Sequence, residues 1–179
     1  MRSLFLVVIL ALLPLRVLAA SNQEDGLFSQ LKKAGSADAA KPIEDKLNQL
    51  FRISGSPSVD LLMSRAAAAL GQADNAAARS LIDAVTSLAP HYAEGWRVKA
   101  QMQEAAGEDT GAMISLQRTI LLNPRHFAAM TELAGMLEDY GDKREALKLY
   151  RRVLALDPHL KIAAEREKAL AKGIEGQGI

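Results

Sequence analysis

The chain has 179 residues, of which 49% are hydrophobic and 4% aromatic, and its formal net charge is +1. This length and hydrophobic content suffice for one domain with a buried core. A near-neutral charge argues against nucleic-acid binding, which needs a strongly positive surface. Because the chain has no cysteine, disulfides, thiolate metal sites and the lipid attachment of a bacterial lipoprotein are excluded. Abundant Ala and Leu with few aromatic residues favour an all-α fold.

Residues 1–19 have the pattern of a secretory signal peptide. Arg2 precedes an apolar run that ends at Leu13, and small residues follow at Ala19 and Ala20. This order of charged, apolar and small residues is typical of segments that a signal peptidase removes. We expect cleavage after Ala19, with Ala20 as the second choice, and therefore an exported, periplasmic protein.

A retained membrane anchor is the alternative interpretation of this segment. A spanning helix needs about 20 apolar residues, and Pro14 and Arg16 interrupt the run. Cleavage would remove Arg2 and Arg16 and no acidic residue, so the formal charge would change from +1 to −1. We therefore expect contact with a membrane only through the signal peptide before cleavage.

Residues 20–58 are expected to form a degenerate helical hairpin that caps the repeats which follow. Apolar residues recur at helical spacing around Leu27 and again from Ile43 to Phe51, with a break at Gly35 between them. Asp38 is a candidate N-cap for the second helix.

Residues 59–172 are expected to form a helical array with a C-terminal cap, because much of this stretch repeats with a period of 34 residues. Residues that would face the interior come in sets of three, and two of these sets are alanines, which suit the closest approach of paired helices. A proline follows each second helix because it cannot donate the next backbone hydrogen bond. These sets are Leu62, Trp96, Met130; Ala66, Ala100, Ala134; Ala78, Ala112, Ala146; Ile82, Leu116, Tyr150; Val85, Thr119, Val153; Leu88, Leu122, Leu156; and Pro90, Pro124, Pro158.

Residues 59–158 resemble the tetratricopeptide repeat (TPR). The third unit matches best, the second is close, and the first is looser, with Ala73 where a turn glycine is usual and Arg65 where the family often has leucine. In the second unit Lys99 also replaces such a leucine, and Gln103 replaces a large aromatic residue. The third unit carries Met130, Leu133, Ala134, Leu137, Tyr140, Gly141, Asp142, Ala146, Tyr150, Val153, Asp157 and Pro158, and the second carries Trp96, Ala100, Gly107, Ala112, Leu116 and Pro124. The resemblance implies an α-solenoid of three helical hairpins.

A last amphipathic helix is expected from about residue 160 to 172, with Gly173 as its stop signal. Its charged outer side suits a terminal repeat, which must face water. The tail from 173 to 179 is rich in glycine, and we expect it to be disordered.

The resemblance also implies a concave groove that takes a peptide or a partner helix. The first helix of each unit would supply its lining, and Ala67 and Gly135 would lie among the contact residues. Some family members hold a partner's terminal carboxylate with Lys and Asn side chains on this face. Because that set is missing here, a mixed polar and apolar segment is the expected partner, and a merely solvated face is the alternative. The predicted partner-binding residues are Met63, Leu70, Arg97, Gln101, Glu104, Thr131 and Glu138.

Other candidate chemistry is weaker. His91, His126 and His159 follow the repeat prolines, but equivalent loops of successive repeats lie roughly 10 Å apart, whereas metal ligands must converge on one ion. Acidic residues at 104, 108–109, 138–139 and 142 lie at helix junctions, where they favour helix starts. A basic stripe at 144, 148, 151 and 152 is either the solvated outer face or a docking site for an anionic surface. We expect no cofactor, no metal and no enzymatic activity.

The sequence thus predicts an exported protein–protein interaction module that scaffolds or chaperones an envelope protein through the concave groove. The alternative is a catalytic or metal-dependent accessory of cell-wall assembly, which rests only on the histidines and the acidic turns.

Overall fold

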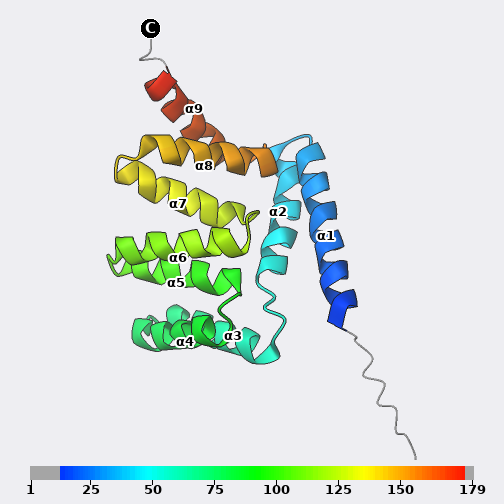
Figure 1. Cartoon of the computed structure of the whole chain (residues 1–179), viewed down its shortest axis with the longest axis vertical. Helices are drawn as coiled ribbons and strands as arrows, with labels where there is room; N and C mark the ends of the chain where they lie inside the picture. Colours follow the sequence, from blue (N-terminus) through cyan, green and yellow to red (C-terminus); the bar gives the residue numbers. More distant parts are fainter. Residues whose placement is uncertain (1–12, 176–179) are drawn as a thin grey trace, which may run out of the picture.

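The computed structural model describes the backbone of residues 13–175 and the side chains of residues 22–174. Within these residues the regular structure is entirely helical, as the composition predicts (Figure 1). The helices are α1 (Leu13–Lys33), α2 (Ala37–Phe51), α3 (Pro57–Gly71), α4 (Asn75–Leu88), α5 (Ala93–Ala105), α6 (Asp109–Leu122), α7 (Phe127–Asp139), α8 (Lys143–Leu156) and α9 (Lys161–Glu175).

Most of the predicted signal peptide lies outside the described residues. Residues 1–12 are not described, and residues 13–19 are described only as the backbone that begins α1. None of the helices in the described part of the chain is both long and apolar enough to cross a membrane.

Helices α3 to α8 form the three predicted hairpin units, α3–α4, α5–α6 and α7–α8, which stack in sequence (Figure 1). The turn inside each unit needs one residue with positive φ, and it is Ala73 (φ 58°), Gly107 (φ 74°) and Gly141 (φ 85°) in turn. A left-handed residue is a common end to a helix, and glycine adopts it without steric cost. Ala73 therefore takes a strained conformation at the turn of the first unit.

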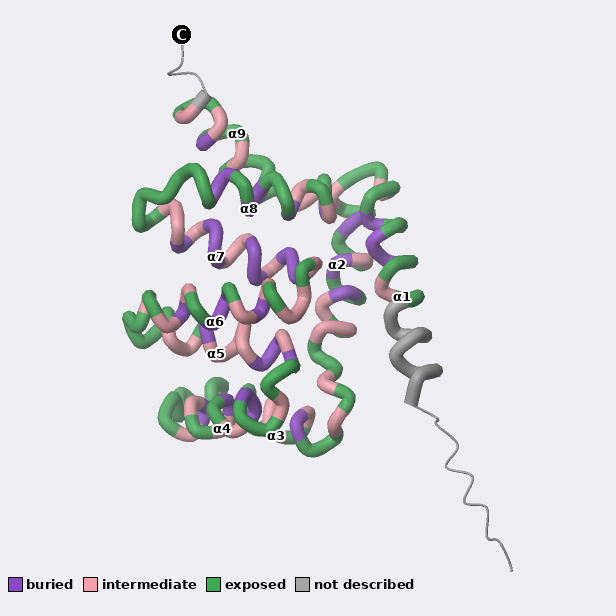
Figure 2. The backbone as a smooth tube through the Cα atoms, viewed as in Figure 1, coloured by how far each residue is buried: buried purple, intermediate pink, exposed green. Residues whose placement is uncertain are grey.

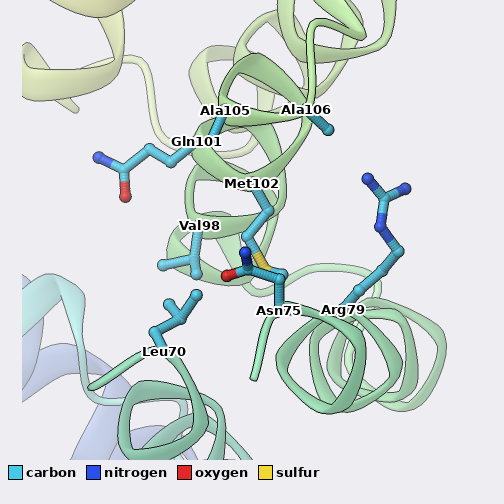
Figure 3. Close-up of a pocket in the computed structure, with 8 residues that line it drawn as sticks. All are labelled: Leu70, Asn75, Arg79, Val98, Gln101, Met102, Ala105 and Ala106. Carbon is cyan, nitrogen blue, oxygen red and sulfur yellow. The ribbon is translucent and has the colours of Figure 1, made fainter. Parts of the chain in front are cut away.

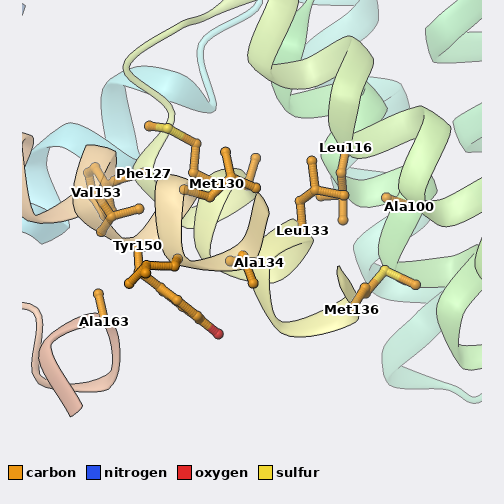
Figure 4. Packing of buried hydrophobic residues seen from close by; sticks show 14 of the residues in the cluster. Ala100, Leu116, Phe127, Met130, Leu133, Ala134, Met136, Tyr150, Val153 and Ala163 are labelled. Carbon is orange, nitrogen blue, oxygen red and sulfur yellow. The ribbon is translucent and has the colours of Figure 1, made fainter. Parts of the chain in front are cut away.

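The two alanine sets lie at the closest helix approaches, as the period predicts. All six side chains, Ala66, Ala78, Ala100, Ala112, Ala134 and Ala146, are at most 1% exposed. Figure 2 shows the buried residues on the inner sides of the stacked helices, and Figure 4 shows how larger side chains fill the space around Ala100 and Ala134. The large core extends from α1 to α9 and includes Leu116, Met130 and Tyr150.

The first unit has a small core cluster that is separate from the large core. Its residues Val59 and Val85 form a separate small cluster with Tyr92. In the second unit, Gln103 takes the place of an aromatic residue and accepts a hydrogen bond from the Ser115 hydroxyl at 2.6 Å. A polar side chain is tolerated there because it has a partner.

The α1–α2 hairpin is present, but it lies along one edge of the stack instead of stacking on α3 and α4 (Figure 1). It touches each of the three loops between successive helical pairs. Arg52 O accepts from the Tyr92 hydroxyl at 2.7 Å, the Phe51 ring lies 4.7 Å from the His126 ring, and His159 Nε2 donates to the carbonyl oxygen of Ala34 at 2.6 Å. The α1–α2 hairpin therefore lies across all three of these loops, and we call it the hairpin strap.

Both ends of the array differ in detail from the expectation. Ser36, not Asp38, caps α2 by accepting from the backbone N–H of Ala39. At the other end α9 packs on α8 through Ala163 and Leu170, as expected. However, it continues past Gly173 to Glu175, so the predicted disordered tail begins with helix, and residues 176–179 lie outside the description.

Candidate binding groove

A groove of about 450 Å³ lies between α3 and α5, on the first helices of the first two units. Part of its lining is made of small and apolar side chains, among them Ala66, Ala67 and Val98. A second hollow of about 220 Å³ continues from it toward the turn of the second unit and shares Leu70, Val98 and Gln101 with it. Figure 3 shows Leu70 and Val98 facing each other across this second hollow. Apolar concave surfaces with a few polar groups are the usual form of a binding site.

Four of the seven predicted contact residues meet in this groove: Met63, Leu70, Arg97 and Gln101. The other three are placed elsewhere. Glu104 is exposed near the end of α5, while the Thr131 hydroxyl donates to the carbonyl of Phe127 in its own helix.

Glu138 forms an ion pair with Arg166 of α9, with 3.3 Å between Oε2 and Nε. Helix α9 therefore binds the Glu138 carboxylate, which we predicted from the sequence to contact a partner in the groove.

Arg97 is bound by two carboxylates of the protein itself. Its Nε and one terminal nitrogen donate to Glu94 at 2.8 Å each, and the other terminal nitrogen donates to Glu132 at 2.7 Å. Gln101 donates to the same Glu132 oxygen at 2.8 Å. Two-point guanidinium–carboxylate pairing is among the strongest hydrogen bonding in proteins. Because Arg97 is already paired twice, it is not free to hold the terminal carboxylate of a partner.

His126 completes this network below the groove. Its Nδ1 accepts the backbone N–H of Ala129 and so caps α7, which leaves the proton on Nε2. That N–H donates to Glu94 at 3.0 Å, and the histidine side chain is 1% exposed. His126 is thus a buried helix cap that also orients Glu94.

The pKa values of the two carboxyl groups in the network are shifted in opposite directions, that of Glu94 downward and that of Glu132 upward. Burial alone would raise the pKa of Glu94, but hydrogen bonds from Arg97 and His126 outweigh it and hold the pKa at about 2. For Glu132 burial is the largest influence, and it raises the pKa despite the nearby Arg97 and Gln101. Glu132 Oε2 is buried and has no hydrogen-bond partner. Glu94 is therefore the firmly ionised member of the network.

The end of the groove nearest the hairpin is formed by residues that sequence reasoning missed. Arg52, which caps the C-terminus of α2, lines it together with Asp60 and Tyr92. Asp60 is held by the backbone N–H and hydroxyl of Ser54 at 3.0 and 2.6 Å. Position 52 lies outside the repeat, so the 34-residue period carries no signal for it.

The three histidines do not converge. His126 is bound to Glu94 and His159 to the Ala34 carbonyl, while His91 is exposed in the α4–α5 loop. In the described part of the chain no group of three His, Asp or Glu side chains is placed to hold a metal ion.

A TPR repeat-containing protein of Rhizobium etli is 32% identical to this chain over 152 residues, which cover 85% of the chain and 74% of that protein. The chain belongs to the TPR repeat-containing proteins. No protein-family model matches its sequence. The TPR fold also agrees with solved structures. The Sgt2 TPR domain from Aspergillus fumigatus has a TM-score of 0.59 at 19% identity, covering 68% of this chain and 82% of that domain. The first TPR of Spaghetti (RPAP3), bound to an HSP90 peptide, has a TM-score of 0.59 at 16% identity, covering 65% of this chain and 93% of that domain.

Proposed function

We propose that this TPR protein is an exported interaction module that scaffolds or chaperones an envelope protein, which it binds in the α3–α5 groove. The observation that carries the proposal is the groove itself. Met63, Leu70 and Val98 offer apolar surface, and Gln101, an exposed residue whose amide nitrogen donates to Glu132, lies at its side. A TPR domain of the same fold holds a peptide in the Spaghetti structure. Protein binding is the common role of this repeat architecture, whose stacked units create extended concave surfaces.

The bound segment is expected to present apolar side chains from within a chain. Arg97 is 15% exposed and satisfied by Glu94 and Glu132, so a terminal carboxylate would have to displace an internal ion pair to reach it. An apolar side chain in the groove needs no such exchange, because it replaces water against Met63 and Leu70.

The groove is tested by introducing a charge into it. Met63→Glu should abolish recovery of the partner when the tagged protein is isolated from a periplasmic extract, since the new carboxylate would be buried against apolar side chains. Ile114→Glu is the matched control, because Ile114 lies on α6 and is 60% exposed. Both variants should keep the helical circular-dichroism spectrum. Equal recovery of the same partners by both variants would refute the groove as the binding site.

Export is supported by the charged, apolar and small-residue order of residues 1–19. The contacts that hold α1 to the array are made by later residues, such as Arg125 with Glu24 at 2.7 Å and Phe28 with Phe127, so cleavage after Ala19 would spare them. Intact-mass measurement of the protein from a periplasmic fraction should give a chain that begins at Ala20. A chain of full length in the membrane fraction would instead indicate a retained anchor.

A further inference from the structure

The hairpin strap places an arginine at one end of the α3–α5 groove. Arg52 lines this end together with Tyr92, and it is an exposed residue. In the described part of the chain, its guanidinium group has no ion-pair or hydrogen-bond partner. The other cation that lines the groove, Arg97, is paired with Glu94 and Glu132. Among the described residues of the groove, Arg52 is therefore the cation that remains available to a partner.

The backbone of Arg52 is held in place although its side chain is not. Its N–H donates to two carbonyl oxygens in the last turn of α2, at 3.2 and 3.3 Å. Its own carbonyl oxygen accepts from the Tyr92 hydroxyl at 2.7 Å, and the preceding residue, Phe51, lies against His126. A cation at a helix C-terminus also suits the helix dipole. Because the backbone is already fixed, a partner that binds this cation has only the side chain to order.

The two carboxylates that line the groove are engaged by other residues. Asp60 Oδ1 accepts from the backbone N–H and the hydroxyl of Ser54. Glu94 accepts from Arg97 and His126. Neither of them forms an ion pair with the strap arginine in the described structure. A carboxylate for this arginine must therefore come from a partner.

Tyr92 joins this cation to the apolar part of the groove. Its hydroxyl contacts Arg52, and its side chain belongs to the small core cluster against which Met63 packs. Arg52 and Met63 thus both lie beside one tyrosine side chain. The apolar lining continues at Leu70, about two turns further along α3, and at Val98 on α5. The groove therefore offers a positive charge at one end and apolar surface next to it.

We propose that the segment bound in the α3–α5 groove carries an aspartate or glutamate side chain that pairs with Arg52, next to an apolar side chain that packs against Met63. This inference rests on the proposed function, because it specifies the chemistry of the segment that the groove binds. A guanidinium group pairs with a carboxylate through two parallel hydrogen bonds, so the pair fixes the direction of the segment as well as its charge. Arg97 keeps its internal partners throughout.

Selection of a random peptide library on the purified protein tests this preference. The wild type should enrich peptides that carry Asp or Glu beside an apolar residue. Arg52→Glu should instead enrich peptides with Lys or Arg at that place, because a like charge at the end of the groove repels the acidic ones. Arg65→Glu is the matched control, since Arg65 is exposed on α3 and does not line the groove. This variant should keep the wild-type preference although its net charge changes by the same amount.

Affinity measurements on one enriched peptide separate the ion pair from a general effect of charge. Replacing the acid of the peptide by its amide should weaken binding to the wild type about fivefold at low salt, as for an exposed ion pair. The same replacement should leave binding to Arg52→Gln unchanged, because that variant has no cation to lose. All variants should keep the helical circular-dichroism spectrum.

The outcomes separate this inference from the groove itself. If Met63→Glu abolishes peptide binding but the peptides show no acidic preference, the pairing with Arg52 is refuted and the groove stands. The same holds if Arg52→Glu selects the same peptides as the wild type, or if the amide weakens binding to Arg52→Gln as much as to the wild type. A selection that enriches no peptide, or only peptides that bind Met63→Glu as tightly as the wild type, refutes the groove and this inference together.

Discussion

Replacing Arg97 by methionine removes the cation that two carboxylates share beside the groove. The Arg97 side chain is 15% exposed and that of Glu94 4%, so water cannot take over the lost hydrogen bonds. Removing one partner of a buried ion pair typically costs about 3–5 kcal/mol, because the remaining charge is left uncompensated. Glu94 would retain only His126 as a side-chain partner. We therefore expect Arg97→Met to lower the free energy of unfolding by about 3–5 kcal/mol at neutral pH.

The assay is urea unfolding followed by circular dichroism, with Lys148→Met as the control. Lys148 pairs with Glu145, but both side chains are more than half exposed (68% and 52%), and such pairs contribute about 0–1 kcal/mol. The difference in free energy of unfolding between the wild type and Arg97→Met should also become smaller as pH falls. The wild type loses the contribution of Glu94 as pH drops from the ordinary carboxyl range toward its folded pKa of about 2. A loss below about 1 kcal/mol, or one that does not change with pH, would show that Arg97 is a surface residue and refute the network.

Two further substitutions test the repeat register. Ala100→Leu should destabilise by about 1–3 kcal/mol through overpacking at a close helix crossing, whereas Lys148→Leu should change the melting temperature little. Equal melting temperatures for those two variants would contradict the register. Ala73→Gly should raise the free energy of unfolding by about 0.5–1 kcal/mol. The strain energy relieved at the left-handed position is larger than the stability lost through the extra conformational entropy that glycine gives the unfolded chain. A melting temperature below that of the wild type would mean that the φ of 58° at Ala73 carries no strain.

The repeats could be predicted from sequence because their physical causes are local and periodic. Alanine at a close crossing, as at Ala100 and Ala134, recurs in each unit at the same spacing, and the structure buries both. The turn of the first unit could be predicted for the same reason, because Ala73 occupies the position equivalent to Gly107 and Gly141 in the other two units.

The hairpin strap could not be placed from sequence, because its contacts join residues with no periodic relation. Leu27, Phe28 and Phe51 are recognisable as an apolar helical face, but nothing in the sequence says whether that face meets α3 or the loop edge. The choice of partner depends on the Phe51–His126 and Phe28–Phe127 ring contacts, which link distant parts of the chain.

The candidate site was predicted in part. The helix register places Met63, Leu70, Arg97 and Gln101 on one face, and they do line one groove. Arg97 was expected to be available to a partner, however, and Glu94 and Glu132 hold it. The Glu94–Arg97 spacing of three residues on one helix is a signal of such a pair, but the pairing with Glu132 depends on how two successive units stack.

We expect a protein partner to occupy the groove between α3 and α5. The most direct test places a photoreactive amino acid at Val98, which lines both parts of the groove, and irradiates living cells. The control carries the same residue at Ile114, which is exposed on α6. We predict a covalent adduct with an envelope protein at Val98 and none at Ile114. Absence of an adduct at Val98, or the same adducts at both positions, would contradict this account.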